Sequence, residues 1–106
     1  MDLSIVIPAG KNEEWTSMTV DDILKNKRGD TEIIVVADGW WIEPRIIDHK
    51  DVRIIKLSEP IGQRKAQNLG VKLSRAKYVM KMDSHCAVEE GFDVKMLEAF
   101  RRLGIT

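Results

Sequence analysis

The 106-residue sequence has a single cysteine, few aromatic residues and no excess of either charge. Cys86 has no partner for an intramolecular disulfide, so nothing in the sequence indicates an oxidising compartment. The 17 basic residues balance the 17 acidic ones, which leaves no overall field to attract nucleic acid or a membrane surface. Any anion must therefore be bound by local geometry.

Long apolar runs are also absent. The apolar stretch near the start, residues 3–7, is far too short for a signal peptide or a membrane span. We therefore expect no membrane segment and a cytoplasmic location. The length and the 43% hydrophobic content allow one domain around one core, covering residues 1–106.

Three common phosphate-site patterns are missing as well. No G-x-G-x-x-G follows the first apolar run, which argues against a dinucleotide-binding Rossmann site. No Walker A sequence occurs. The first run also ends without an acidic pair, which argues against a response-regulator receiver domain.

What the sequence does contain is an alternation of two patterns of apolar residues, one typical of strands and one typical of helices. Short apolar, β-branched runs predict strands at residues 3–7, 32–36, 52–57 and 77–82. Helical spacing predicts helices over residues 12–27, with Asn12 as the N-cap, about 61–73, and about 89–103. In the first of them, Val20 and Ile23 fall on one helical face. Strands that alternate with helices indicate an α/β fold with a mainly parallel sheet.

The four predicted strands end at residues 8–10, 37–39, 58–60 and 83–85. In open α/β sheets, ligands bind outside the carboxyl ends of the strands. Three of these ends carry a carboxylate or a small residue where the chain must turn. The sequence therefore predicts a binding site along this one edge of the sheet.

The last strand end carries the most specific pattern. Asp83 and His85 are two residues apart, so in an extended strand their side chains lie on the same side. A carboxylate and an imidazole suit Mn²⁺ or another divalent ion, which would bridge a diphosphate. The alternative, that His85 caps or packs at the strand end, stays open.

Taken together, these segments resemble family 2 glycosyltransferases of the GT-A fold. Residues 4–9 with 12–14 resemble the opening of that family, and residues 32–39 are similar to its second strand, which usually ends in two aspartates and a glycine. Residues 62–70 resemble its Gly-rich helix, and residues 78–85 fall where it has an Asp-x-Asp signature. The Asp-Ser-His-Cys sequence at 83–86 is closer to the polypeptide N-acetylgalactosaminyltransferases. The resemblance implies a Rossmann-like sheet in the order 3-2-1-4, the nucleotide-sugar-binding half of a GT-A domain.

The resemblance also implies a role for each candidate site residue. The donor would be a UDP-sugar, held through Mn²⁺ (or Mg²⁺), and the acceptor stays unidentified. Pro8, Ala9 and Glu13 would line the uridine pocket, Asp38 would contact the uracil or ribose, Arg64 or Lys65 would approach the base or diphosphate, and Asp83 with His85 would hold the metal on the phosphates.

Complete enzymes of this fold are roughly twice as long or more. We therefore expect the chain to represent half of such an enzyme, to bind donor weakly, and to transfer little or no sugar alone. No acid after Asp83 is placed as a catalytic base, and Glu89, Glu90 and Asp93 are interpreted as first-turn helix acids. An unpaired sheet edge would allow self-association.

Two departures from the family pattern keep other functions open. Ala37 replaces the first of the paired aspartates, and Gly10 stands where an aromatic residue is commoner. The Ala37 substitution and the missing second half of the enzyme favour a non-catalytic nucleotide-binding or interaction module of the same fold. A nucleotidyltransferase of related fold is a further alternative, which a preference for a base other than uracil would indicate.

Overall fold

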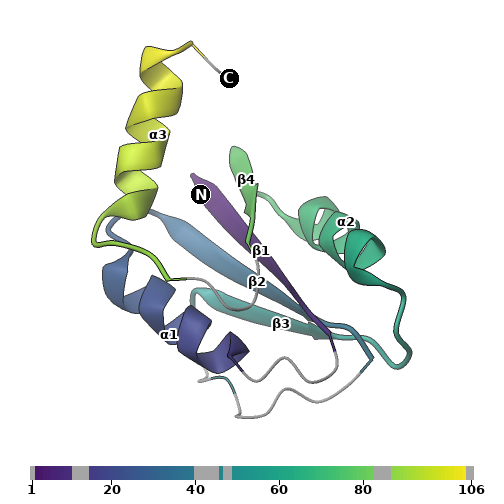
Figure 1. The fold of residues 1–106 in the computed structure, drawn as a ribbon. Helices are drawn as coiled ribbons and strands as arrows, with labels where there is room; N and C mark the ends of the chain where they lie inside the picture. Colours follow the sequence, from purple (N-terminus) through teal and green to yellow (C-terminus); the bar gives the residue numbers. More distant parts are fainter. Residues whose placement is uncertain (1, 11–14, 40–45, 47–48, 83–86, 105–106) are drawn as a thin grey trace.

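The computed structural model describes residues 2–10, 15–39, 46, 49–82 and 87–104. Strands and helices follow one another along the chain as predicted (Figure 1). The elements are β1 (Leu3–Ala9), α1 (Thr16–Asn26), β2 (Thr31–Ala37), β3 (Val52–Lys56), α2 (Gln63–Leu73), β4 (Tyr78–Lys81) and α3 (Phe92–Arg102). Among the described residues, no helix has the length and apolar character needed to cross a membrane.

The four strands form one parallel sheet in the order β3-β2-β1-β4, which confirms the predicted α/β fold and strand order. The two inner strands, β1 and β2, are buried along their whole length, as their unbroken apolar runs predict. The two outer strands are only partly covered, and each of their residues is half-buried or exposed. The continuous-burial pattern therefore holds for the centre of the sheet and weakens at its edges.

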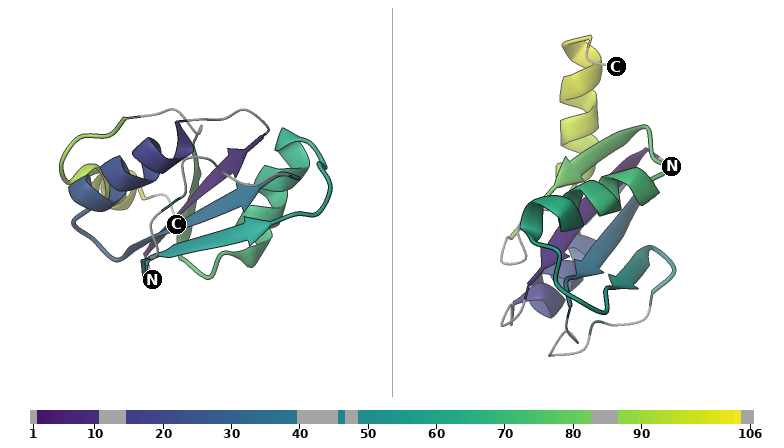
Figure 2. Two further views of the ribbon diagram at one scale, coloured as in Figure 1. Left: turned by 90° about the horizontal axis from the view of Figure 1, so that it is seen from below. Right: turned by 90° about the vertical axis from the view of Figure 1, so that its right-hand side faces the viewer.

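Helices α1 and α2 cover opposite faces of the sheet (Figure 2). Because successive side chains of a strand point to opposite faces, β1 contributes Ile5 and Ile7 to the core under α1 and Val6 to the core under α2. From α1, the predicted face of Val20 and Ile23 is buried against the sheet. The edge at which the sequence predicts a binding site thus belongs to a sheet that is packed on both faces.

Helix α2 approaches β1 so closely that one helical position has room only for hydrogen. A Cβ on Gly70 would overlap the Cγ1 methyl of Val6 and would lie 3.4 Å from a methyl of Val36. Gly70 is therefore required by packing and not by backbone conformation. This contact fixes how near α2 lies to the two central strands.

Helix α1 begins later than its sequence pattern predicts. Its first residue is Thr16, so Asn12 is too far away to be the N-cap, and residues 11–14 lie outside the described part of the chain. The residue before the helix, Trp15, makes no side-chain capping bond and is 52% exposed. Trp15 thus leaves about half of its surface to solvent.

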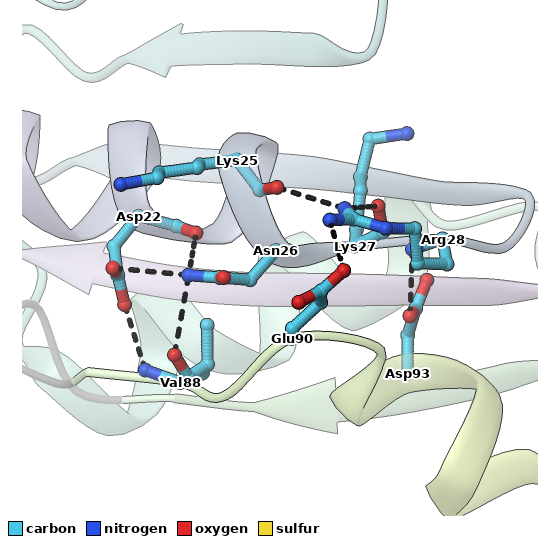
Figure 3. Close-up of polar contacts among 8 residues, drawn as sticks. All are labelled: Asp22, Lys25, Asn26, Lys27, Arg28, Val88, Glu90 and Asp93. Atoms are coloured by element: carbon cyan, nitrogen blue, oxygen red, sulfur yellow. Dashed lines mark hydrogen bonds and ion pairs between the residues drawn. The ribbon is translucent and has the colours of Figure 1, made fainter.

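The segment that leads into α3 is held by side chains of α1 (Figure 3). The Val88 N–H donates to Asp22 Oδ2 at 2.7 Å, and the Val88 carbonyl accepts from Asn26 Nδ2 at 3.2 Å. Further along α3, the Phe100 ring lies 5.5 Å from that of Tyr78 on β4. Helix α3 is thereby attached to α1 through the segment before it and to β4 through Phe100, while its last turn extends beyond the sheet (Figure 1).

Asp93, in the first turn of α3, is fully buried and accepts four hydrogen bonds. Its Oδ1 accepts from the N–H groups of Arg28 (3.0 Å) and Val94 (2.9 Å), and its Oδ2 accepts from Gly29 N–H (2.9 Å) and the Thr31 hydroxyl (2.6 Å). The interpretation of Asp93 as a dipole-stabilised helix acid is thus incomplete, because two of these donors belong to the α1–β2 connection and a third, Thr31, begins β2. Burial alone would raise the pKa of Asp93, but the four hydrogen bonds outweigh it and hold the pKa below its ordinary value of 3.8.

This lowered pKa predicts acid sensitivity. A carboxylate whose pKa is lower in the folded state contributes stability above its unfolded pKa and loses it as the pH falls through the folded value. We expect the free energy of unfolding to decrease between about pH 5 and pH 2. Urea titrations at several pH values measure this slope, and Asp93→Asn, which cannot titrate, should flatten it. An unchanged slope in that variant would show that other groups govern acid unfolding.

Candidate active site at the carboxyl edge of the sheet

The carboxyl ends of β1 and β2 meet at a small hollow lined by Pro8, Gly10, Asp38 and Gln63. The two ends are joined by a bond from the Asp38 N–H to the Ala9 carbonyl, 2.9 Å long. Pro8 is two residues after Val6 and Asp38 two residues after Val36, and both of these belong to the core under α2. Because residues two apart in a strand share a face, Pro8 and Asp38 lie on the α2 side of the sheet. The first residue of α2, Gln63, closes the hollow on that side.

Asp38 is 8% exposed, and both of its carboxylate oxygens accept backbone hydrogen bonds. Oδ1 accepts from Ile61 N–H at 2.7 Å and Oδ2 from Gly62 N–H at 3.0 Å. These two donors come directly before α2, where the chain has no helical partners to offer them. Asp38 therefore ties the end of β2 to the start of α2.

Beside this carboxylate, two turns touch backbone to backbone. Gly39 has a φ of +82°, and a Cβ there would lie 2.5 Å from the Pro60 nitrogen. Both the positive φ and the close approach require glycine at this position. The turn after β2 is thereby pressed against the turn before α2, which leaves the wall of the hollow little freedom.

Pro8 explains why the pairing between β1 and β4 is short. Along β1, the even-numbered residues bond toward β4, where Tyr78 N–H donates to Asp2 O and Met82 N–H donates to Val6 O. The next donor in this ladder would be the N–H of residue 8, which proline lacks. Among the described residues the ladder therefore ends at Met82, and no residue of β4 pairs with the carboxyl end of β1.

The other predicted site residues lie in different settings. Ala9 is fully buried in the core under α1, on the opposite face of the sheet from Pro8. Arg64 and Lys65 are exposed on the first turn of α2, next to Gln63. The structure thus brings together Pro8 and Asp38, keeps the two cations nearby, and places the Ala9 side chain in the core.

Glu13, Asp83 and His85 lie outside the described residues. The described chain stops one residue short of Asp83, at Met82, whose N–H donates to the Val6 carbonyl at 2.9 Å. Within the part of the chain that the structure describes, no group of three or more His, Cys, Asp or Glu side chains has the arrangement of a metal site. The predicted metal pair therefore stays a prediction.

Gly10 and Gln63 line the hollow although the sequence pattern did not single them out as binding residues. For Gln63, a signal was present. It is the first residue of the helix that follows Gly62, and the start of that helix was expected to approach the ligand. The residue type carried no such signal, because a glutamine at a helix start is ordinary.

The chain matches the family described as "Glycosyl transferase family 2" over residues 4–105. An "Uncharacterized glycosyltransferase" of Rickettsia bellii (strain RML369-C) is 33% identical over 88 residues, which cover 77% of this chain and 12% of the relative. The structure of S. aureus TarS has a TM-score of 0.76 at 16% identity, over 96% of this chain and 20% of TarS. TarS 1-349 in complex with UDP-GlcNAc has a TM-score of 0.74 at 18% identity, over 97% of this chain and 32% of that one.

This chain therefore spans 12% of the curated relative and a third or less of the TarS chains. The structural neighbours, at 16–18% identity, show the fold, a GT-A-like parallel sheet flanked by helices. The family match is independent of that likeness and takes in nearly all of the sheet and the three helices. From its fourth residue to its last helix, the chain belongs to glycosyl transferase family 2.

Proposed function

We propose that the chain forms the donor-binding part of a glycosyltransferase and binds a UDP-sugar at the carboxyl edge of its sheet. The observation that carries this proposal is the hollow between Pro8, Gly10, Asp38 and Gln63, at the edge where open α/β sheets bind ligands. Two solved relatives of the fold are complexes, TarS 1-349 with UDP and with UDP-GlcNAc. They support a nucleotide-sugar as the ligand class.

The proposed contacts with the donor begin at the hollow and extend to the first turn of α2. Pro8 offers an apolar wall to the uridine, and Asp38 supplies a polar group beside it. The family resemblance would add Glu13, which lies outside the described residues. Arg64 and Lys65, on the exposed first turn of α2, bring two positive charges beside the hollow, where a diphosphate would need them. Ala9 shapes the site through its backbone, since its side chain faces the core.

For the metal we propose Mn²⁺ (or Mg²⁺), bound by Asp83 and His85. The chemistry of this donor set fits the ion, because one carboxylate and one imidazole leave positions open for phosphate oxygens. When bound, the metal neutralises charge on the diphosphate leaving group. The Asp-x-His-Cys pattern at 83–86 supports a likeness to the polypeptide N-acetylgalactosaminyltransferases at this motif.

The test is calorimetric titration of UDP into the 106-residue chain with Mn²⁺ present and with excess EDTA. We expect binding that depends on the metal and is lost when Asp83→Ala is combined with His85→Ala. Removing both protein ligands leaves the ion without the contacts that attach it to the chain. Sugar transfer by the chain alone should be slight, because the chain spans a small share of its relatives.

The sequence offers a matched control. Asp21→Ala with His49→Ala removes the same two side-chain types from exposed positions, on α1 and just before β3. This control should bind UDP as the unchanged chain does. Metal-independent UDP binding would contradict the assignment of Asp83 and His85, and absence of UDP binding to the unchanged chain would contradict the donor site itself.

One observation favours a second candidate, a non-catalytic module of the same fold. Ala37, at the position of the family's first aspartate, is 2% exposed and belongs to the core under α1. A carboxylate that family members commonly have is therefore replaced by a packed methyl group. UDP binding without any transfer, even after the chain is joined to the remaining length of a relative, would favour this candidate.

A further inference from the structure

The balance of charges over the whole chain hides a separation of charge within it. Residues 52–82, from β3 to just past β4, carry eight basic side chains and one acidic side chain, a net charge of +7. The rest of the chain carries nine basic and sixteen acidic side chains, a net charge of −7. All eight basic residues of the positive segment are exposed. The surface therefore has a local positive field that the sum over the chain does not reveal.

Seven of these cations lie on α2, which is in front of the sheet in the right-hand view of Figure 2, or on the segments next to it. Three are on α2 itself, two are in its connection to β4, and β3 and β4 have one each. Lys81 of β4 pairs with Val6 of the core under α2, and Arg53 of β3 donates to the carbonyl of Leu73, the last residue of α2, at 3.0 Å. We call this surface the basic face, and it consists of Arg53, Arg64, Lys65, Lys72, Arg75, Lys77 and Lys81.

The charge of the basic face is hardly neutralised. Arg53 forms an ion pair with Glu32 at 3.1 Å, and the other six cations form no ion pair with any residue that the structure describes. The acids next to this face are, with one exception, buried or half-buried; the exception is Glu59, and the others are Asp2, Glu32, Asp38 and Asp51. An anionic partner can therefore approach these cations without first breaking existing ion pairs.

Aliphatic side chains are exposed between the cations. Leu73, at the end of α2, and Val79, on β4, are each 38% exposed, and each has a basic residue within two positions on either side. The two stretches adjoin, because the Ser74 hydroxyl donates to that of Ser4 at 2.7 Å and Ser4 pairs with Val79. The basic face thus combines positive charge with exposed apolar groups.

This combination distinguishes among anionic partners. Single-stranded nucleic acids bind to cations interleaved with aromatic side chains that stack on the bases. Among its described residues the basic face has no exposed aromatic side chain, because Tyr78 packs against the core under α1. A bilayer with anionic headgroups attracts the cations, and its interface also accepts aliphatic groups and the apolar stems of lysine and arginine. The composition of the basic face therefore favours a bilayer surface.

We propose that the basic face binds the surface of a bilayer that contains anionic lipids, with α2 lying along that surface. This inference goes beyond the proposed function and does not depend on it. Helix α2 has 11 residues and is therefore about 16 Å long, with the hollow at its first residue and most of the cations of the basic face beyond its middle. Bilayer binding and the donor site can accordingly be tested separately.

Flotation of the 106-residue chain with lipid vesicles tests the proposal. We expect the chain to bind vesicles of phosphatidylcholine with about one quarter phosphatidylglycerol, and not phosphatidylcholine alone. Binding should be lost in about 1 M salt, which shortens the Debye length to about 3 Å. Equal binding to the two kinds of vesicle, or no binding to the anionic ones, would overturn the proposal.

The variant combines Lys72→Gln, Arg75→Gln and Lys77→Gln, three changes away from the hollow. It should weaken partition into anionic vesicles about a hundredfold, since each cation near such a surface contributes roughly fivefold. Its circular dichroism and its UDP binding should match those of the unchanged chain. If the triple variant does not fold, Lys72→Gln alone, at an exposed helical position, should still weaken partition about fivefold.

The matched control combines Lys25→Gln, Lys50→Gln and Lys95→Gln. It removes three exposed cations from α1, from the turn before β3 and from α3, and it changes the net charge by the same amount. The control should bind anionic vesicles as the unchanged chain does. An equal loss in the two triple variants would show that total charge governs binding and that the basic face has no special role.

Two further measurements separate the other anionic partners. Leu73→Gln with Val79→Thr should weaken vesicle binding about tenfold, because less apolar surface enters the interface. Tighter binding to a DNA duplex or to polyglutamate than to anionic vesicles would overturn the proposal, and so would self-association that the basic-face variant abolishes. If vesicles do not bind but UDP does, the inference is wrong while the donor site stands. If vesicles bind and UDP does not, the inference stands while the proposed function is wrong.

Discussion

Asp93→Ala should lower the free energy of unfolding by about 3–5 kcal/mol, because each buried donor left without its acceptor costs about 1–3 kcal/mol. The substitution leaves three backbone N–H groups and the Thr31 hydroxyl without their acceptor, in a place that is fully buried. Since small domains are stable by roughly 5–15 kcal/mol, this is a large share of the total. Urea unfolding followed by circular dichroism measures it.

Glu90→Ala is the control for that experiment. Glu90 lies three residues earlier and forms an ion pair with Arg28 at 2.8 Å, but both side chains are largely exposed. Exposed pairs of this kind contribute about 1 kcal/mol or less. Equal effects of the two substitutions would show that the Asp93 contacts add nothing beyond a surface charge pair.

Gly70→Ala is expected to destabilise the chain by about 2 kcal/mol, against the usual preference of helices for alanine. The added methyl group would overlap Val6, at a contact where α2 meets the most buried strand of the sheet. Either α2 moves outward or the Val6 side chain leaves its preferred rotamer, and both loosen the core under α2. Thermal and urea unfolding measure the loss.

The same argument predicts that the effect of Gly70→Ala on stability changes sign when Val6 is replaced as well. Val6→Ala removes both methyl groups that a Cβ on Gly70 would meet most closely. In that background, Gly70→Ala should be neutral or stabilising by up to about 1 kcal/mol, because only the helix propensity remains. Asn68→Ala, at an exposed position of the same helix, controls for propensity alone. A loss of equal size in both backgrounds would rule out the Val6 contact as its cause.

Most of the fold was predictable from the sequence because its signals are local or repeated. The unbroken runs in β1 and β2 predicted the buried centre of the sheet, and the helical spacing of Val20 and Ile23 predicted the buried face of α1. The strand order came from the family resemblance, since apolar runs alone do not say which strands are neighbours. The start of α1 was predicted too early because Asn12 has the character of an N-cap, and residue type alone does not fix where a helix begins.

The candidate site was predictable as an edge of the sheet and less so as individual contacts. Asp38 was identified because it ends a strand, but its partners Ile61 and Gly62 belong to another connection. Three of the four donors to Asp93 likewise lie more than 60 residues away, so neighbouring sequence gives no hint of them. Acidic side chains carry the same pattern whether they bind a ligand or a distant backbone, and only the tertiary structure separates the two.

The strand order also has a consequence for how the chain folds as it is made. On one side, Leu3 of the central strand pairs with Thr31, which is synthesised soon afterwards, but on the other side it pairs with Tyr78. Until β4 emerges, β1 therefore presents an open, apolar edge that can pair with another nascent chain. Conditions that slow synthesis between β3 and β4 should prolong this exposure, and the yield of soluble protein should then depend on the time that the chain spends with three of its four strands made.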